Sequence, residues 1–128
     1  MSVGPDDLLA FAKELSERSD EVARRAAISR AYYAGFHAAV SVFGPPSVAS
    51  SAHSAIIEEA EREVRLCFGA QRRHATELAR ALKRCRKHRR TADYNLEIKL
   101  SESDSKQALS LAQEAIIAAG LLAEFEWV

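Results

Sequence analysis

The chain has 128 residues, of which 48% are hydrophobic and 28% charged, a balance that excludes a disordered protein. This length predicts one domain, residues 1–128, with a core large enough to fold without disulfides or metal. Because 18 basic and 18 acidic residues cancel, attraction to nucleic acid requires a local patch. The opening "MSVGPDDLL" lacks a signal-peptide pattern and no apolar run suits a membrane span, so we expect a cytoplasmic protein that does not bind membranes.

The spacing of apolar residues is helical throughout, and no stretch alternates as a strand would. Five helices are expected. The first runs from Pro5 to the break "SERSD", and the second from Ser19 or Asp20 to about Phe43. The third begins at Ser51 or Ser54, the fourth covers roughly 72–93, and the fifth runs from Ser101 or Ser103 to the end region. The Pro- and Ser-rich segment 44–54 separates the second from the third. We therefore predict an all-α, up-down bundle of four to five helices.

The second predicted helix is apolar around most of its circumference, which indicates the central position in the bundle. Small residues recur on one side and would let another helix approach closely: Ala27, Ala31, Gly35 and Ala39. Polar residues form a narrow arc on the remaining side: Arg30, Tyr33, His37 and Ser41. By spacing alone, this arc is either a solvent-facing window or an internal polar site.

In the fourth predicted helix, Arg89 falls in the middle of the apolar face and Asp93 at its edge. A buried guanidinium costs several kcal/mol unless it is paired. We therefore hypothesise that Asp93 accepts from Arg30, from Arg89 or from both, with a tyrosine hydroxyl closing the network. The alternative is that all three residues lie at the rim of the bundle.

Three segments together resemble the HEPN superfamily of prokaryotic helical-bundle proteins: "ISRAYYAGFHAAV" (28–40), "AHSAIIEE" (52–59) and "CRKHRRTADYNL" (85–96). They are similar to a subgroup with Ser-Arg-x-Tyr-Tyr in its second helix, Arg-x-x-Ala-Asp-Tyr in its fourth, and a histidine opening the helix after the loop, here His53. The resemblance covers roughly residues 5–123. It implies a HEPN-like bundle that is usually a homodimer, often encoded beside a minimal nucleotidyltransferase in toxin–antitoxin or defence modules. The polar centre expected from these motifs comprises Arg30, Tyr33, Arg89, Asp93 and Tyr94.

Catalytic members of that superfamily are metal-independent endoribonucleases, in which an arginine is followed after a short spacer by a histidine at the start of the late helix. Here Arg89 is followed by Asp93 and Tyr94, with no histidine at the expected place. The catalytic candidates that remain are Arg30 with His37, in a different helix, and His88 with Arg89, at a different spacing. We therefore expect a non-catalytic or weakly active component that binds RNA or a partner. An endoribonuclease and a purely structural dimerisation module are the alternatives.

Basic residues are concentrated in the fourth predicted helix, where segment 72–90 holds nine of the 18 Lys and Arg residues against one acid, Glu77. Four of them share its outer face and are spaced to contact successive phosphates: Arg80, Lys83, Lys87 and Arg90. The alternative is a solvated face that the glutamates of the third helix offset. Few aromatics interleave with these residues, so stacking on single-stranded bases has little support.

No metal or cofactor is expected. Cys85 and His88 would make half of a metal site, but the sequence offers no second half. The tail "LLAEFEWV" is rich in large apolar side chains. It either docks on its own bundle or is buried in a dimer or under a partner protein.

Overall fold

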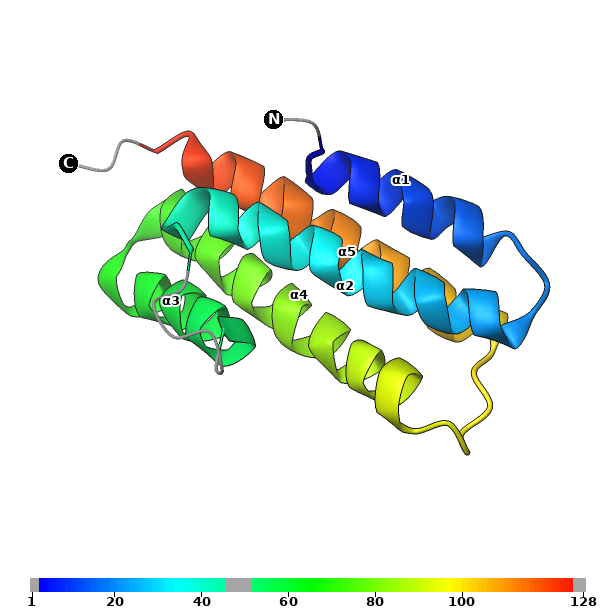
Figure 1. Cartoon of the computed structure of the whole chain (residues 1–128). Helices are drawn as coiled ribbons and strands as arrows, with labels where there is room; N and C mark the ends of the chain where they lie inside the picture. Colours follow the sequence, from blue (N-terminus) through cyan, green and yellow to red (C-terminus); the bar gives the residue numbers. More distant parts are fainter. Residues whose placement is uncertain (1–2, 46–51, 126–128) are drawn as a thin grey trace.

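The structure is a computed structural model that describes residues 3–45 and 52–125 (Figure 1). Five helices follow one another: α1 (Pro5–Ser16), α2 (Glu21–Phe43), α3 (Ala52–Leu66), α4 (Gly69–Tyr94) and α5 (Glu102–Ala123). Helices α1, α2, α4 and α5 alternate in direction along the chain, and the shorter α3 packs mainly against α4. The predicted all-α helical bundle is confirmed.

The helix starts follow from local capping chemistry. Asp20 precedes α2, and its Oδ2 accepts from the backbone N–H of Ala23 at 3.1 Å. Ser101 precedes α5 in a reciprocal cap, in which its backbone N–H donates to Asp104 Oδ2 at 2.7 Å. One boundary differs: α4 begins at Gly69, rather than near residue 72, and the positive φ of 59° at this glycine allows the tight turn from α3 into α4.

Helix α2 is the central helix and contacts each of the other four. The predicted stripe of small residues on α2 is buried throughout. A Cβ added at Gly35 would lie 3.3 Å from Ala115 Cβ on α5 and 3.5 Å from Leu82 Cδ2 on α4. The close approach of helices at this stripe is therefore confirmed, and it fixes how α2 is rotated in the bundle.

The described part of the tail packs on the bundle of its own chain. Leu122 is fully buried, and the ring of Phe125 lies 6.2 Å from that of His74 on α4. Trp127, the other large aromatic of the tail, lies outside the described residues. Across residues 3–45 and 52–125, no helix has both the length and the apolarity needed to cross a membrane.

Replacing Gly35 with Val should lower the free energy of unfolding by about 1–3 kcal/mol, because the added methyl groups meet packed side chains of α4 and α5. The matched control is Gly120→Ala on α5, where an added Cβ meets no atom within 4 Å. That change should raise the free energy of unfolding by up to about 1 kcal/mol through helix propensity. Urea denaturation measures both, and equal effects would contradict the close packing at Gly35.

Candidate functional site

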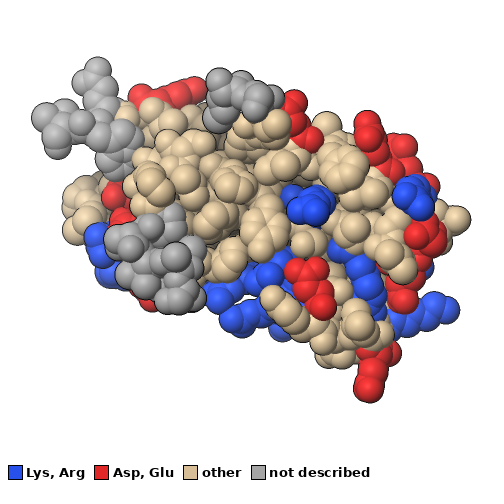
Figure 2. Space-filling model, in the orientation of Figure 1, with Lys and Arg blue, Asp and Glu red and all other residues tan. Residues whose placement is uncertain are grey.

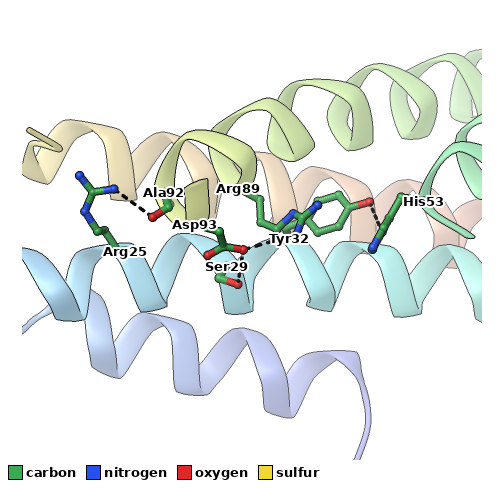
Figure 3. A network of polar contacts seen from close by, with 7 residues as sticks. All are labelled: Arg25, Ser29, Tyr32, His53, Arg89, Ala92 and Asp93. Atoms are coloured by element: carbon green, nitrogen blue, oxygen red, sulfur yellow. Dashed lines mark hydrogen bonds and ion pairs between the residues drawn. The ribbon is translucent and has the colours of Figure 1, made fainter. Parts of the chain in front are cut away.

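A polar stripe on α2 faces α4, and it is not the arc that the sequence singled out. It consists of Arg25, Ser29 and Tyr32, which lie four and then three residues apart and therefore share one side of the helix. Figure 3 shows the three side chains directed toward the last turns of α4 and the start of α3. This stripe connects the end of α4 to the interior of the bundle.

Arg25 caps the C-terminal end of α4. Its Nη1 donates to the carbonyl oxygens of Ala92 at 2.9 Å and of Thr91 and Asn95 at 3.3 Å. Its Nη2 donates to the carbonyls of Leu96 and Ile98 in the following loop. A cation at a helix C-terminus satisfies the free carbonyls and complements the helix dipole. Arg25 therefore stabilises the end of α4 and the start of the loop that follows.

Arg89 lies one turn before that end and is 7% exposed, as its position on the apolar face predicted. Its Nη1 lies 3.4 Å from Asp93 Oδ2, and the Ser29 hydroxyl donates to the same oxygen at 3.3 Å. The hypothesis that Asp93 accepts from an arginine is confirmed for Arg89. The carboxylate, whose side chain is 29% exposed, thus pairs with the buried guanidinium at the solvent-facing end of the network.

Three tyrosine rings surround the Arg89 guanidinium. Its Cζ lies 5.5 Å from the ring centroid of Tyr32, 5.9 Å from that of Tyr33 and 5.6 Å from that of Tyr94, within the range of cation–π attraction. Burial alone would lower the pKa of Arg89, but Tyr94, Tyr33 and Asp93 raise it above its ordinary value. The positive charge is therefore retained. Of the three tyrosines, Tyr94 is largely exposed, so the cage is open on one side.

Tyr32 joins Arg89 to the first turn of α3. Its hydroxyl lies 2.9 Å from Nδ1 of His53, and burial raises its pKa to about 12. The pKa of His53 is lowered by burial and then by the charges of Arg89, Arg86 and Arg90. Near pH 7, His53 is consequently neutral and can serve as a hydrogen-bond partner of the tyrosine.

Arg30 and His37 do not belong to this centre. Both are exposed, on the solvent side of α2, so the prediction that Arg30 belongs to the polar centre was wrong. The small-residue stripe sets the rotation of α2, which directs Ser29 toward α4 and turns its neighbour Arg30, about 100° further round the helix, to water. The arc of Arg30, Tyr33, His37 and Ser41 is therefore mainly a solvent-facing window.

His88 also lies apart from the centre. It lines a depression with Arg84, Lys87 and Thr91 of α4 and Asp104 of α5, and burial lowers its pKa while Asp104 opposes the shift. The catalytic candidates thus occupy separate places. Arg30 and His37 are on the solvent side of α2, and His88 faces the α4–α5 connection. Arg89 is buried between α4 and α2, against the ring of Tyr32.

The basic residues of α4 meet α3 along a groove of about 500 Å³. Its lining comprises Ser54, Ile57, Glu58, Glu61, Lys83, Arg86, Lys87 and Arg90. Of the four phosphate-contact candidates, Lys83, Lys87 and Arg90 are in this groove, and Arg80 lines the adjoining hollow with Lys83. Figure 2 shows Lys and Arg side chains gathered along the lower part of the drawn face.

The sequence interpretation missed three members of the centre. It noted Tyr32 and His53 only as motif residues and did not consider Arg86, whose Nη1 donates to Ser54 Oγ at 3.3 Å. The spacing of Arg25, Ser29 and Tyr32 was a usable signal, since it marks a second polar side on α2. The part played by His53 carried no such signal, because a contact between α2 and α3 brings it there.

The described residues contain no cluster of His, Cys, Asp or Glu arranged to hold a metal ion. Raised pKa values disfavour the nucleophilic thiolate form of both cysteines: burial raises the pKa of Cys85 to about 12, and burial with a hydrogen bond to Glu63 raises that of Cys67 to about 11. Comparison of the chain with family models, with curated proteins and with solved structures found no match. Function must therefore be inferred from the geometry of the polar centre and of the α3–α4 groove.

Arg25→Ala should lower the free energy of unfolding by about 1.5–3 kcal/mol, because several carbonyls at the end of α4 lose a charged donor. Arg30→Ala, five residues further along the same helix, should change it by less than about 0.5 kcal/mol, as expected for an exposed side chain. Urea denaturation compares the two variants. An Arg30→Ala effect as large as that of Arg25→Ala would contradict the observed rotation of α2.

Stability should also depend on pH through His53 and His88, whose pKa values are both lowered in the folded chain. The unfolded chain takes up these protons near the ordinary pKa of about 6.5, before the folded chain does. The free energy of unfolding should therefore be highest above about pH 6.5 and fall as the pH is lowered toward 5. Denaturation midpoints measured from pH 5 to 8 should show a shallower dependence in a His53→Gln/His88→Gln variant, and an unchanged dependence would refute this assignment.

Proposed function

We propose that this chain is a HEPN-type bundle that binds RNA along the α3–α4 groove without cleaving it. In this proposal it serves as the RNA- and partner-binding component of a prokaryotic toxin–antitoxin or defence pair. The observation that carries it is the convergence of Lys83, Arg86, Lys87 and Arg90 on one groove beside the polar centre. The motif resemblance described above supplies the biological setting.

The charges in the groove favour an anionic ligand. Lys83 is tied to Glu61, with its Nζ 3.0 Å from Oε2. Among the described residues, that is the one ion pair joining α3 to α4. Arg86, Lys87 and Arg90 then face a single further carboxylate of the lining, Glu58. The excess positive charge follows the axis of α4, a geometry suited to a phosphate backbone.

The geometry gives less support to an endoribonuclease. RNA cleavage without metal needs a base at the 2′-hydroxyl, an acid at the leaving oxygen and a cation for the phosphorane. The candidates Arg30, His37 and His88 occupy separate surfaces, as described above. His53 does lie among arginines, but its neighbour Tyr32 is 1% exposed and has a pKa of about 12, which makes it a poor second proton-transfer group.

Partner binding has its own candidate surface in the α4–α5 connection. Tyr94, Leu96 and Ile98 expose 74%, 72% and 46% of their surface, beside one another in sequence. Neighbouring exposed apolar side chains favour contact with another protein. A second copy of the chain and a minimal nucleotidyltransferase are the partners that the resemblance suggests.

A short single-stranded RNA should bind the wild-type chain with an affinity that falls as salt rises, because phosphate contacts release counterions. A Lys87→Glu/Arg90→Glu variant should bind at least about tenfold more weakly and show a smaller salt slope. Fluorescence anisotropy in the presence of a chelator measures binding, and gel analysis of the same samples detects cleavage.

The matched control is Lys13→Glu/Arg18→Glu, which makes the same charge change on α1 and the following turn; α1 contacts neither α3 nor α4. It should retain most of the affinity. Equal loss in both variants would show general electrostatic attraction and contradict a binding groove. No RNA binding at low salt would favour the structural dimerisation module, and RNA cut in chelator would favour the nuclease.

A further inference from the structure

The junction of α2, α3 and α4 carries more positive charge than its own groups neutralise. Arg86, Arg89 and Arg90 all lower the pKa of His53. Among the described residues, these three cations meet two carboxylates: Asp93, paired with Arg89, and Glu58, in the groove lining. The other groups at the histidine are the rings of Tyr32, Tyr33 and Phe36, with centroids 5.3, 5.7 and 5.0 Å away. On α3 itself, Glu58 and Ser54, the residue that follows His53 in sequence, line the α3–α4 groove.

Two of these arginines also have hydrogen-bonding capacity to spare. Among the described residues, the buried Nε atoms of Arg86 and Arg89 have no hydrogen-bond partner. Asp93 pairs with Nη1 of Arg89, and Ser54 is the described partner of Arg86. A buried donor left unpaired destabilises the fold, so an acceptor that reached it would recover part of that free energy.

We propose that this junction, formed by Arg86 and Arg89 with Ser54 and His53, binds the terminal phosphate monoester of an RNA whose chain continues along the α3–α4 groove. The choice of RNA as the source of the phosphate rests on the function proposed above. Figure 3 shows Arg89, Tyr32 and His53 side by side where α2 meets α3 and α4.

Burial and charge favour a terminal group over a phosphate within the chain. Arg89 is 7% exposed and Tyr32 1%, so one side of the junction is closed by the bundle. An internal phosphodiester needs open space on both sides, whereas a monoester at the end of a strand needs one entrance. A monoester also carries up to two negative charges, which suits paired guanidiniums, the groups best shaped to bind phosphate oxygens.

The direct test compares otherwise identical short RNAs with a 5′-phosphate, a 3′-phosphate or hydroxyls at both ends. One phosphorylated form should bind at least about tenfold more tightly than the all-hydroxyl RNA in anisotropy titrations at fixed salt. A mononucleotide with the same phosphate, used as a competitor, distinguishes the terminal group from the strand. Equal affinity for all three RNAs would overturn the proposal while leaving RNA binding in the groove intact.

The variant test uses Arg86→Gln, which removes one guanidinium from the junction. It should reduce the preference for the phosphorylated end to about twofold or less. The matched control, Arg84→Gln, removes the same charge from α4 at a residue that lines other depressions, and it should keep the preference. Circular dichroism checks that both variants are folded. A preference that survives Arg86→Gln contradicts the site.

A third measurement does not need RNA. Inorganic sulfate keeps its charge between pH 5 and 8, so its effect on His53 is separate from its own titration. Sulfate bound at the junction should raise the pKa of His53 in an NMR titration, relative to chloride at equal ionic strength, because an anion offsets the three arginines. The shift should disappear in Arg86→Gln. No difference between the salts would count against the site, whereas a shift without RNA binding would retain the anion site and refute the proposed function.

Discussion

The buried guanidinium of Arg89 is the constraint around which the rest of the polar centre is arranged. A charge at 7% exposure needs a counter-charge and favourable contacts, and both come from two helices. Asp93, one turn later on α4, provides the carboxylate, while Ser29 and Tyr32 of α2 hold the carboxylate and cover the guanidinium. Any change in the rotation of α2 would separate these groups, so the packing of α2 and the chemistry of the centre are coupled.

That rotation is determined by the small-residue stripe of α2, which lies beside the polar stripe around the helix and lets α5 approach closely. Gly35 leaves room for Ala115 of α5 and Leu82 of α4, and this contact directs Arg25, Ser29 and Tyr32 toward α4. Arg25 then caps the end of α4, while Glu21 and Arg24 hold the following loop by bonds to the backbone of Leu100. The first half of α2 thus organises both the polar centre and the connection to α5.

The same arrangement links the fold to the proposed binding of RNA. Asp93 neutralises Arg89 at one end of the centre, while Arg86 and Arg90 extend from the centre into the groove between α3 and α4. Because His53 is held neutral beside these arginines, it provides a polar group at the junction and adds no further positive charge near pH 7. A site with a partly buried junction and an adjoining open groove suits an RNA whose terminal phosphate enters the junction while its backbone follows the groove.

The sequence by itself determined the all-helical fold, the starts of α2 and α5, the central place of α2 and the burial of Arg89 beside Asp93, because capping residues and helical spacing are local properties. It did not determine which polar arc of α2 faces inward. Arg30 and Ser29 are neighbours in sequence, and only the packing of α5 against Gly35 turns Ser29 toward α4 and Arg30 to solvent. The contact of His53 with Tyr32 likewise depends on how α3 returns to α2, a long-range contact that no local spacing encodes.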